Sequence, residues 1–266
     1  MTLLNRLFPI LLLGLLPLTQ PALAASDAET RGLAIAQEAE RRDAGWRDSQ
    51  VTATMLLTDR RGQTRERSLR IWMLEKPGDA GDKTLTIFDT PADMKGTIFL
   101  AHAVSGGDDN LWLYLPSLKR VKRISSSNKT GAFFGSEFAY EDIAAQEIGK
   151  FTYRYLGDRP CGSLTCYVVE RRPTYPNSGY SALVTFFDTK EYRVQRIEYL
   201  DKGGKPMKVL TLSGYNVYSD RFWRPTTLQM ENLKTGKSTV LTYSGYSFGS
   251  GLSDGDFDSG RLRDIQ

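Results

Sequence analysis

Apolar and polar residues alternate along most of the chain in short runs, and a period of two residues predicts β-strands. Turn pairs such as Arg61-Gly62, Pro77-Gly78 and Gly203-Gly204 separate the runs, and connections this short favour antiparallel hairpins. The predicted strands are residues 51–59, 67–76, 83–89, 95–102, 111–115, 120–124, 151–157, 166–172, 181–188, 193–201, 208–215, 226–232 and 239–246. We therefore expect a mainly β fold built as one long antiparallel meander.

Two segments have helical spacing instead. Residues 27–45 hold apolar residues among charged ones, which predicts one amphipathic helix. Ser26 or Asp27 is expected to cap its start, and Gly45 is expected to end it. A second, short helix is expected near residues 137–146. Both helices should cover part of the sheet.

Several predicted strands are apolar at consecutive positions rather than at alternate ones. Ile98-Phe99-Leu100 and residues 111–115 are the clearest cases. Such strands indicate that both faces of the sheet are covered, or that one face lines a dry cavity.

The first 24 residues have the pattern of a secretory signal peptide. Arg6 supplies a positive start, residues 7–18 form an apolar run, and Ala22-Leu23-Ala24 is a cleavage signal. The run is too short for a membrane span. Because no cysteine stands at the cleavage point, no lipid anchor is expected there. We expect the mature chain, residues 25–266, to be a soluble periplasmic protein of one domain.

Composition and cysteine usage narrow the picture further. A formal charge of +4 favours anionic surfaces without requiring nucleic acid. Cys161 and Cys166 flank a turn, and in an oxidising compartment they are expected to form a disulfide.

Candidate catalytic groups are few. The single histidine, His102, lies at the end of a predicted strand, where a structural role is the better interpretation. Ser247 lies in a G-x-S-x-G sequence, but within a predicted strand and downstream of that histidine, which does not fit a hydrolase elbow. An acidic stretch from Asp254 lacks the glycine and the glutamate of a calcium loop. We expect no enzymatic activity, no cofactor and no metal.

A basic run follows the apolar residues 111–115. It could contact lipid headgroups or a partner protein, or it could be a solvated edge strand protected from aggregation. Export argues against nucleic acid as its partner. The cationic residues are Lys119, Arg120, Lys122 and Arg123.

Two stretches carry a resemblance to a known family. Residues 94–143 contain MKGTIFLAH and then GDDNLWLYLPSLKRVKRISSSNKTGAFFGSEFAYEDI, and residues 192–210 read YRVQRIEYLDKGGKPMKVL. The chain resembles the bacterial outer-membrane lipoprotein-sorting (LolA-like) family over nearly all of its mature length. More specifically, it is similar to the branch associated with exporters of the RND or MMPL type. The resemblance implies a strongly curved, unclosed antiparallel sheet whose concave face is capped by helices and holds acyl chains.

On this basis we expect a monomeric periplasmic carrier for a lipid or lipoprotein, which moves its cargo between an inner-membrane RND/MMPL-type transporter and the outer membrane. The alternative is a periplasmic sensor or regulatory module that responds to lipid or lipoprotein. Residues 129–138 are expected to form a mobile lid, because Gly131 and Gly135 flank two phenylalanines. Arg120 and Arg123 are expected to meet a phosphate or an acidic partner at the rim. The residues expected to line or gate the cavity are Trp72, Phe88, Phe99, Trp112, Leu113, Phe133, Phe134 and Phe138.

Overall fold

The computed structural model describes residues 20–265, with side chains from residue 26 onward apart from Asp79. Most of the expected signal peptide, residues 1–19, lies outside the described residues. Its last five residues begin the first helix.

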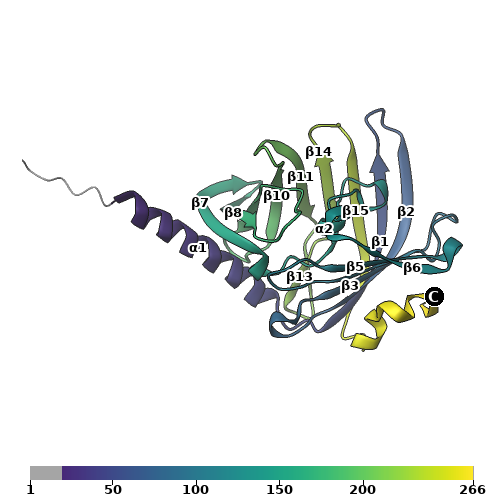
Figure 1. Cartoon of the computed structure of the whole chain (residues 1–266). Helices are drawn as coiled ribbons and strands as arrows, with labels where there is room; N and C mark the ends of the chain where they lie inside the picture. The colour runs from purple at the N-terminus through teal and green to yellow at the C-terminus, as the bar shows by residue number, and fades with distance from the viewer. Residues whose placement is uncertain (1–19, 266) are drawn as a thin grey trace, which may run out of the picture.

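One large antiparallel sheet dominates the fold (Figure 1). Its strands are β1 (Asp48–Thr58), β2 (Thr64–Leu74), β3 (Lys83–Phe88), β4 (Ile98–His102), β5 (Asn110–Leu115), β6 (Arg120–Ile124), β7 (Phe151–Cys161), β8 (Leu164–Pro173), β9 (Ala182–Asp188), β10 (Val194–Leu200), β11 (Pro206–Ser213), β14 (Thr227–Asn232) and β15 (Ser238–Phe248). Each corresponds to a predicted strand, so the strand prediction is confirmed.

The spatial order of the strands is β6-β5-β4-β3-β2-β1-β15-β14-β11-β10-β9-β8-β7. Two meanders are therefore joined where β1 pairs with β15. Strands β6 and β7 are the two edges and do not pair with each other, so the curved sheet is not closed into a barrel. This is the expected unclosed architecture. A separate ribbon of two short strands, β12 (Asn216–Tyr218) and β13 (Phe222–Arg224), was not predicted.

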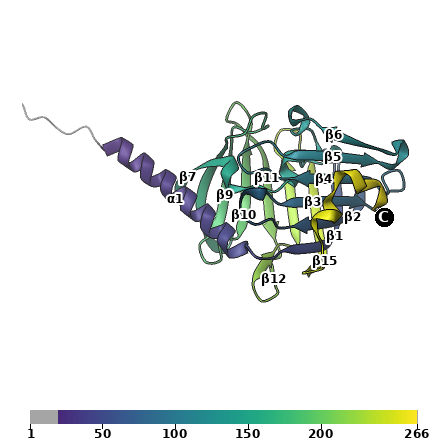
Figure 2. The ribbon, with the colours of Figure 1, turned by 60° about the horizontal axis from the view of Figure 1, so that its bottom comes forward.

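Helix α1 (Gln20–Asp43) runs along the β7 edge of the sheet (Figure 2). It passes straight through Ser26 and Asp27, so the predicted cap is wrong; Pro21 and the alanines that follow it favour an earlier start. A Cβ at Gly32 would lie 2.8 Å from the backbone nitrogen of Tyr155. This glycine therefore permits the close approach of the helix to β7.

The connection from β6 to β7 crosses the concave side of the sheet, where α2 lies in front of β14 and β15 in Figure 1. The single-turn helix α2 is shorter than expected. The helical turns of this connection are η3 (Ser126–Asn128), η4 (Phe133–Gly135), α2 (Tyr140–Ile143) and η5 (Ile148–Lys150).

The C-terminal segment covers the convex face of β2 to β5 through the turns η6 (Asp254–Phe257) and η7 (Ser259–Asp264) (Figure 2). Phe257 and Leu262 are fully buried against Ile98 and Leu100. Phe99, between them on β4, faces the opposite, concave side. The consecutive apolar residues of β4 are thus explained by cover on both faces of the sheet.

Two smaller features complete the fold. The turns η1 (Gly78–Ala80) and η2 (Pro116–Leu118) lie in the loops that follow β2 and β5. Cys161 and Cys166 form the predicted disulfide across the turn between β7 and β8. Among residues 20–265, no helix is both long and apolar enough to cross a membrane.

Candidate functional site

The concave face of the sheet encloses a mainly apolar cavity of about 250 Å³. Side chains of β1, β2, β3, β11, β14 and β15 form its wall. Residues 129–143, which we call the cover segment, lie across the cavity on the side opposite the sheet. The apolar lining residues are Trp46, Met55, Leu69, Ile71, Met73, Phe133, Phe138, Ile143, Ala145, Leu210, Leu228, Leu241 and Tyr243.

An aromatic cluster joins the cover segment to the sheet. The ring centroids of Phe88 and Phe134 are 4.5 Å apart, and those of Phe99 and Phe133 are 5.2 Å apart. Tyr140 also packs edge-on against Phe133 at 5.5 Å. Offset and edge-on aromatic pairs of this kind stabilise a contact beyond simple burial. The structure therefore brings four of the expected phenylalanines together as one cluster.

The remaining expected cavity residues divide between the two faces of the sheet. Phe138 lines the cavity, and Leu113 lies opposite Phe99 in the β4–β5 register, hence on the concave side. Trp72 and Trp112 belong to the convex cluster beneath the C-terminal segment, so the structure does not bring them to the cavity. A shift of one residue along a strand reverses the face, which is why sequence alone could not separate these positions.

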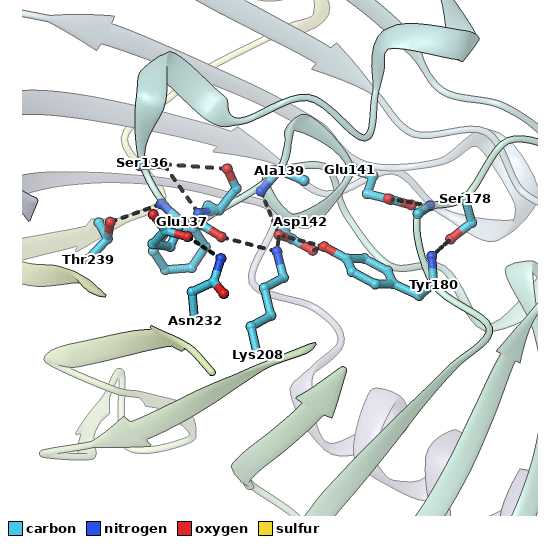
Figure 3. Close-up of polar contacts among 12 residues, drawn as sticks. Ser136, Glu137, Ala139, Glu141, Asp142, Ser178, Tyr180, Lys208, Asn232 and Thr239 are labelled. Atoms are coloured by element: carbon cyan, nitrogen blue, oxygen red, sulfur yellow. Dashed lines mark hydrogen bonds and ion pairs between the residues drawn. The ribbon is translucent and has the colours of Figure 1, made fainter. Parts of the chain in front are cut away.

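A buried ion pair fastens the cover segment to the sheet (Figure 3). Lys208 Nζ, from β11, lies 2.6 Å from Asp142 Oδ2, and the two side chains are 3% and 2% exposed. Lys208 also donates to the carbonyl oxygen of Glu137 at 3.1 Å. The same carboxylate accepts hydrogen bonds from the Ala139 backbone N–H at 2.6 Å and from the Tyr180 hydroxyl at 3.1 Å.

Further hydrogen bonds join the cover segment to other parts of the fold (Figure 3). The backbone N–H of Glu137 donates to Thr239 Oγ1 at 3.0 Å, and Asn232 Nδ2 donates to the Glu137 carboxylate at 2.6 Å. On the other side, Glu141 accepts from the Gly179 backbone N–H at 2.8 Å. The cover segment is thus hydrogen-bonded to β11, β14, β15 and the loop before β9.

Sequence reasoning missed this polar attachment. Its one signal is Lys208, which shares a strand face with Leu210 and Leu212 in the predicted strand 208–215. A lysine at such a position is buried only when a partner satisfies it.

A second, larger cavity of about 1040 Å³ lies between α1, the concave side of β8 to β11 and the β12–β13 ribbon. Its lining combines the apolar side chains Phe187, Ile197 and Leu212 with aromatic residues, arginines and carboxylates. The carboxylates are Glu40, Asp43, Asp82, Glu191 and Asp220. Trp46, Met73 and Asp82 line both this cavity and the smaller one, so the two adjoin.

Comparison with solved structures identifies the fold and the family. A proposed outer membrane lipoprotein-sorting protein domain from Vibrio parahaemolyticus is 46% identical, with a TM-score of 0.86 over 88% of this chain and 99% of that chain. This chain belongs to the outer-membrane lipoprotein-sorting, LolA-like family. A family model described only as "Uncharacterized protein" matches residues 80–264.

Two other solved structures resemble this LolA-like protein. A DUF1329 family protein from Desulfovibrio piger is 29% identical, with a TM-score of 0.83 over 88% of this chain and 99% of that one. A LolA superfamily protein from Nitrosomonas europaea is 19% identical, with a TM-score of 0.69 over 85% of this chain and 97% of that one, and shows the shared fold. No curated protein sequence matches significantly.

The basic run of this LolA-like protein forms the exposed edge of its sheet. Lys119, Arg120, Lys122 and Arg123 are all exposed, on or next to β6. The guanidinium of Arg123 donates to Asn110 Oδ1 of the neighbouring strand. The prediction of an edge strand is therefore confirmed. Contact of this edge with a headgroup or partner stays a prediction.

The other candidate chemical groups have structural partners. His102 Nε2 lies 2.8 Å from the Phe257 carbonyl oxygen, which ties β4 to the C-terminal segment, and burial lowers the pKa of this histidine. Asp254 accepts hydrogen bonds from Lys76 and Lys83, each at 2.7 Å. Ser247 is exposed, and its oxygen lies 3.3 Å from that of Ser250. Within residues 20–265 no group of three His, Cys, Asp or Glu side chains is placed to hold a metal ion.

Proposed function

We propose that this protein is a periplasmic carrier that binds the acyl chains of a lipid or lipoprotein in the cavity on its concave face. The observation that carries the proposal is that cavity itself, which is lined mainly by apolar side chains of the unclosed sheet and covered by the cover segment. The family relationship and the name of the Vibrio relative support the same function.

The energetics of lipid transfer explain why such a cavity is needed. Removing two acyl chains of about sixteen carbons each from water is worth roughly 25 kcal/mol, at about 0.8 kcal/mol per methylene. A lipid therefore does not cross an aqueous compartment unaided at a useful rate. The carrier cavity must be nearly as apolar as the bilayer, and no more so, or the cargo would not leave it.

We propose that the cover segment moves when cargo enters, because the cavity behind it is small. The volume of about 250 Å³ is below the roughly 300–1,000 Å³ of pockets that take small molecules. Gly131 and Gly135 flank the cover-segment phenylalanines, and Gly135 has a φ of 75°, which glycine adopts without strain. Displacement of Phe133 would enlarge this cavity, which already adjoins its larger neighbour at Trp46, Met73 and Asp82.

The route that we propose runs from an inner-membrane transporter of the RND or MMPL type to the outer membrane, with the carrier acting as a monomer and without catalysis. The exposed basic edge at β6 is the proposed docking surface for an anionic membrane or an acidic transporter surface. Such contacts guide association and weaken with salt.

The test is native mass spectrometry of the mature protein purified from a bacterial periplasm without detergent, followed by identification of any bound molecule. We expect a stoichiometric lipid or acylated protein. A protein that is empty, and that also takes up no lipid from vesicles of phosphatidylethanolamine and phosphatidylglycerol, would contradict the carrier function and favour a partner-binding regulatory module.

A further inference from the structure

Arg171, on β8, differs from the other buried cations of the protein. Among the described residues, Lys129, Lys150, Lys208 and Arg171 are the cationic side chains less than 9% exposed. Each of the three lysines forms an ion pair, with Asp108, Asp109 and Asp142 respectively. Arg171, which is 8% exposed, forms no ion pair with any carboxylate that the structure describes.

The side chain of Arg171 points to the concave side of the sheet and lines the larger cavity. It lies opposite Tyr153 and Leu183 on the neighbouring strands, and both of these belong to the concave core. Its Nε donates to Thr185 Oγ1 at 2.8 Å, and its guanidinium carbon lies 5.0 Å from the ring centre of Phe151. These contacts fix the guanidinium plane and engage only one of its five N–H donors in a described hydrogen bond.

The tyrosines that pack around Arg171 supply no negative charge. Burial raises the pKa of Tyr153 to about 12 and that of Tyr199 well above its usual value, so both phenols stay neutral. The Tyr153 hydroxyl already donates to the Ile148 carbonyl oxygen at 3.0 Å. Burial lowers the pKa of Arg171, yet an arginine keeps its charge at physiological pH. A buried cation without an anion is costly, and an anionic ligand would remove that cost.

We propose that Arg171 binds the acid group, a carboxylate or a phosphate, of an anionic amphiphile whose chain lies in the two adjoining cavities. This rests on the proposed carrier function and names the chemical class of its cargo. A guanidinium matches either acid group with two parallel hydrogen bonds, and such charge-assisted bonds are the strong ones. Phe187, Ile197 and Leu212 of the larger cavity offer apolar contact next to the acid group.

The test compares three probes that share a sixteen-carbon chain: hexadecanoic acid, hexadecyl phosphate and hexadecanol. Their dissociation constants are measured by calorimetry for the mature protein and for Arg171→Gln. We expect the wild type to bind at least one of the acids about tenfold or more tightly than the alcohol. Arg171→Gln should lose this preference and keep its affinity for hexadecanol. The acid that binds more tightly shows whether the site recognises a carboxylate or a phosphate.

Arg172→Gln is the matched control, because this neighbouring arginine has a 57% exposed side chain that pairs with Glu170. It should keep the full preference for the acid. If Arg171→Gln does not fold, Arg171→Lys, which keeps the charge but loses the fork, should show a reduced preference. Equal affinity of the wild type for acids and alcohol would overturn the anion site and leave the carrier function intact. Failure to bind any of the three probes would overturn the carrier function, and this proposal with it.

Discussion

The ammonium group of Lys208 and the carboxylate of Asp142 lie 2.6 Å apart, although 66 residues separate them in the chain. Lys208 lies on β11, the strand that contributes Leu210 to the cavity wall, and Asp142 belongs to the cover segment and lines the cavity. Both side chains are almost completely shielded from solvent. This buried ion pair and the aromatic cluster together hold the cover segment against the sheet.

Lys208→Met should lower the free energy of unfolding by about 3 kcal/mol or more, because it leaves the Asp142 carboxylate buried and without its cation. The double variant Lys208→Met/Asp142→Asn should recover much of this loss, since it removes the unpaired charge and keeps an oxygen that can accept from Ala139 and Tyr180. Urea unfolding followed by tryptophan fluorescence measures both effects.

Lys234→Met provides the control for this experiment. Lys234 pairs with Asp201, but its side chain is 47% exposed. An exposed pair contributes less than about 1 kcal/mol, so this variant should be close to wild type. If the double variant at positions 208 and 142 is as unstable as the single one, the loss comes from packing and not from an uncompensated charge.

The aromatic part of the closure is tested by Phe133→Asp and Phe134→Asp. In a folded protein each change should abolish or strongly reduce the uptake of lipid from vesicles, because a carboxylate beside Phe88 and Phe99 opposes an apolar occupant. Lipid uptake is measured with a fluorescent phospholipid, and folding is checked by circular dichroism.

Trp112→Ala separates a cavity effect from a general loss of packing. Trp112 lies on the convex face, where it contacts the His102 ring at a centroid distance of 4.8 Å. We expect this variant to lose stability and to keep lipid uptake. Unchanged uptake in the two Asp variants would show that the cover segment does not gate the cavity.

The alternation of apolar and polar residues was sufficient to predict all thirteen strands of the large sheet, because each strand is bounded by turn residues. It was not sufficient to decide on which face of the sheet each side chain lies. The convex face of β2 to β5 is covered by residues 252–265, where Phe257 and Leu262 stand among glycines and aspartates without any regular period. Trp72 and Trp112 were therefore grouped with the concave phenylalanines.

The buried polar contacts of the cover segment could not be predicted from the sequence, for a different reason. Lys208 and Asp142 meet only because the connection between the two edge strands crosses back over the sheet. That path is a property of the tertiary fold, and single-sequence patterns report only local spacing. The role of Arg171 could not be predicted either, because it follows Glu170 and precedes Arg172 at what looks like an ordinary charged strand end.

The basic edge is tested by replacing its four cations, Lys119, Arg120, Lys122 and Arg123, with glutamine. Binding to vesicles that contain phosphatidylglycerol should weaken several-fold at low salt, and the difference should shrink as ionic strength rises. Vesicle co-sedimentation across a salt series measures both.

The same charge change made elsewhere is the control. Arg60, Arg61, Arg65 and Lys237 are exposed at the far end of β1, β2 and β15, and their replacement by glutamine should affect binding less. Equal weakening by the two sets would mean that net charge, and not the β6 edge, determines the attraction.

Asp82 lines both cavities, and its ionisation makes the stability of the protein depend on pH. Burial, with added repulsion from Glu147, Glu75 and Glu40, raises the pKa of Asp82 from 3.8 to about 7. Between these two values the folded protein binds more protons at this site than the unfolded chain does. The contribution of Asp82 to stability is therefore present at acidic pH and lost as the pH rises toward about 7.

Asp82→Asn should accordingly gain stability relative to wild type as the pH rises from about 4 to about 7, and the difference should then stay constant. The asparagine oxygen can still accept the hydrogen bond that Asp82 Oδ1 receives from the Lys76 backbone N–H. Urea unfolding at intervals from pH 4 to pH 8 measures the difference. Asp254→Asn is the control, because Lys76 and Lys83 lower the pKa of Asp254 to about 2, so its difference from wild type should be constant over this range. Parallel stability curves for wild type and Asp82→Asn would mean that Asp82 is ionised in the folded protein throughout, and that water reaches the junction of the two cavities.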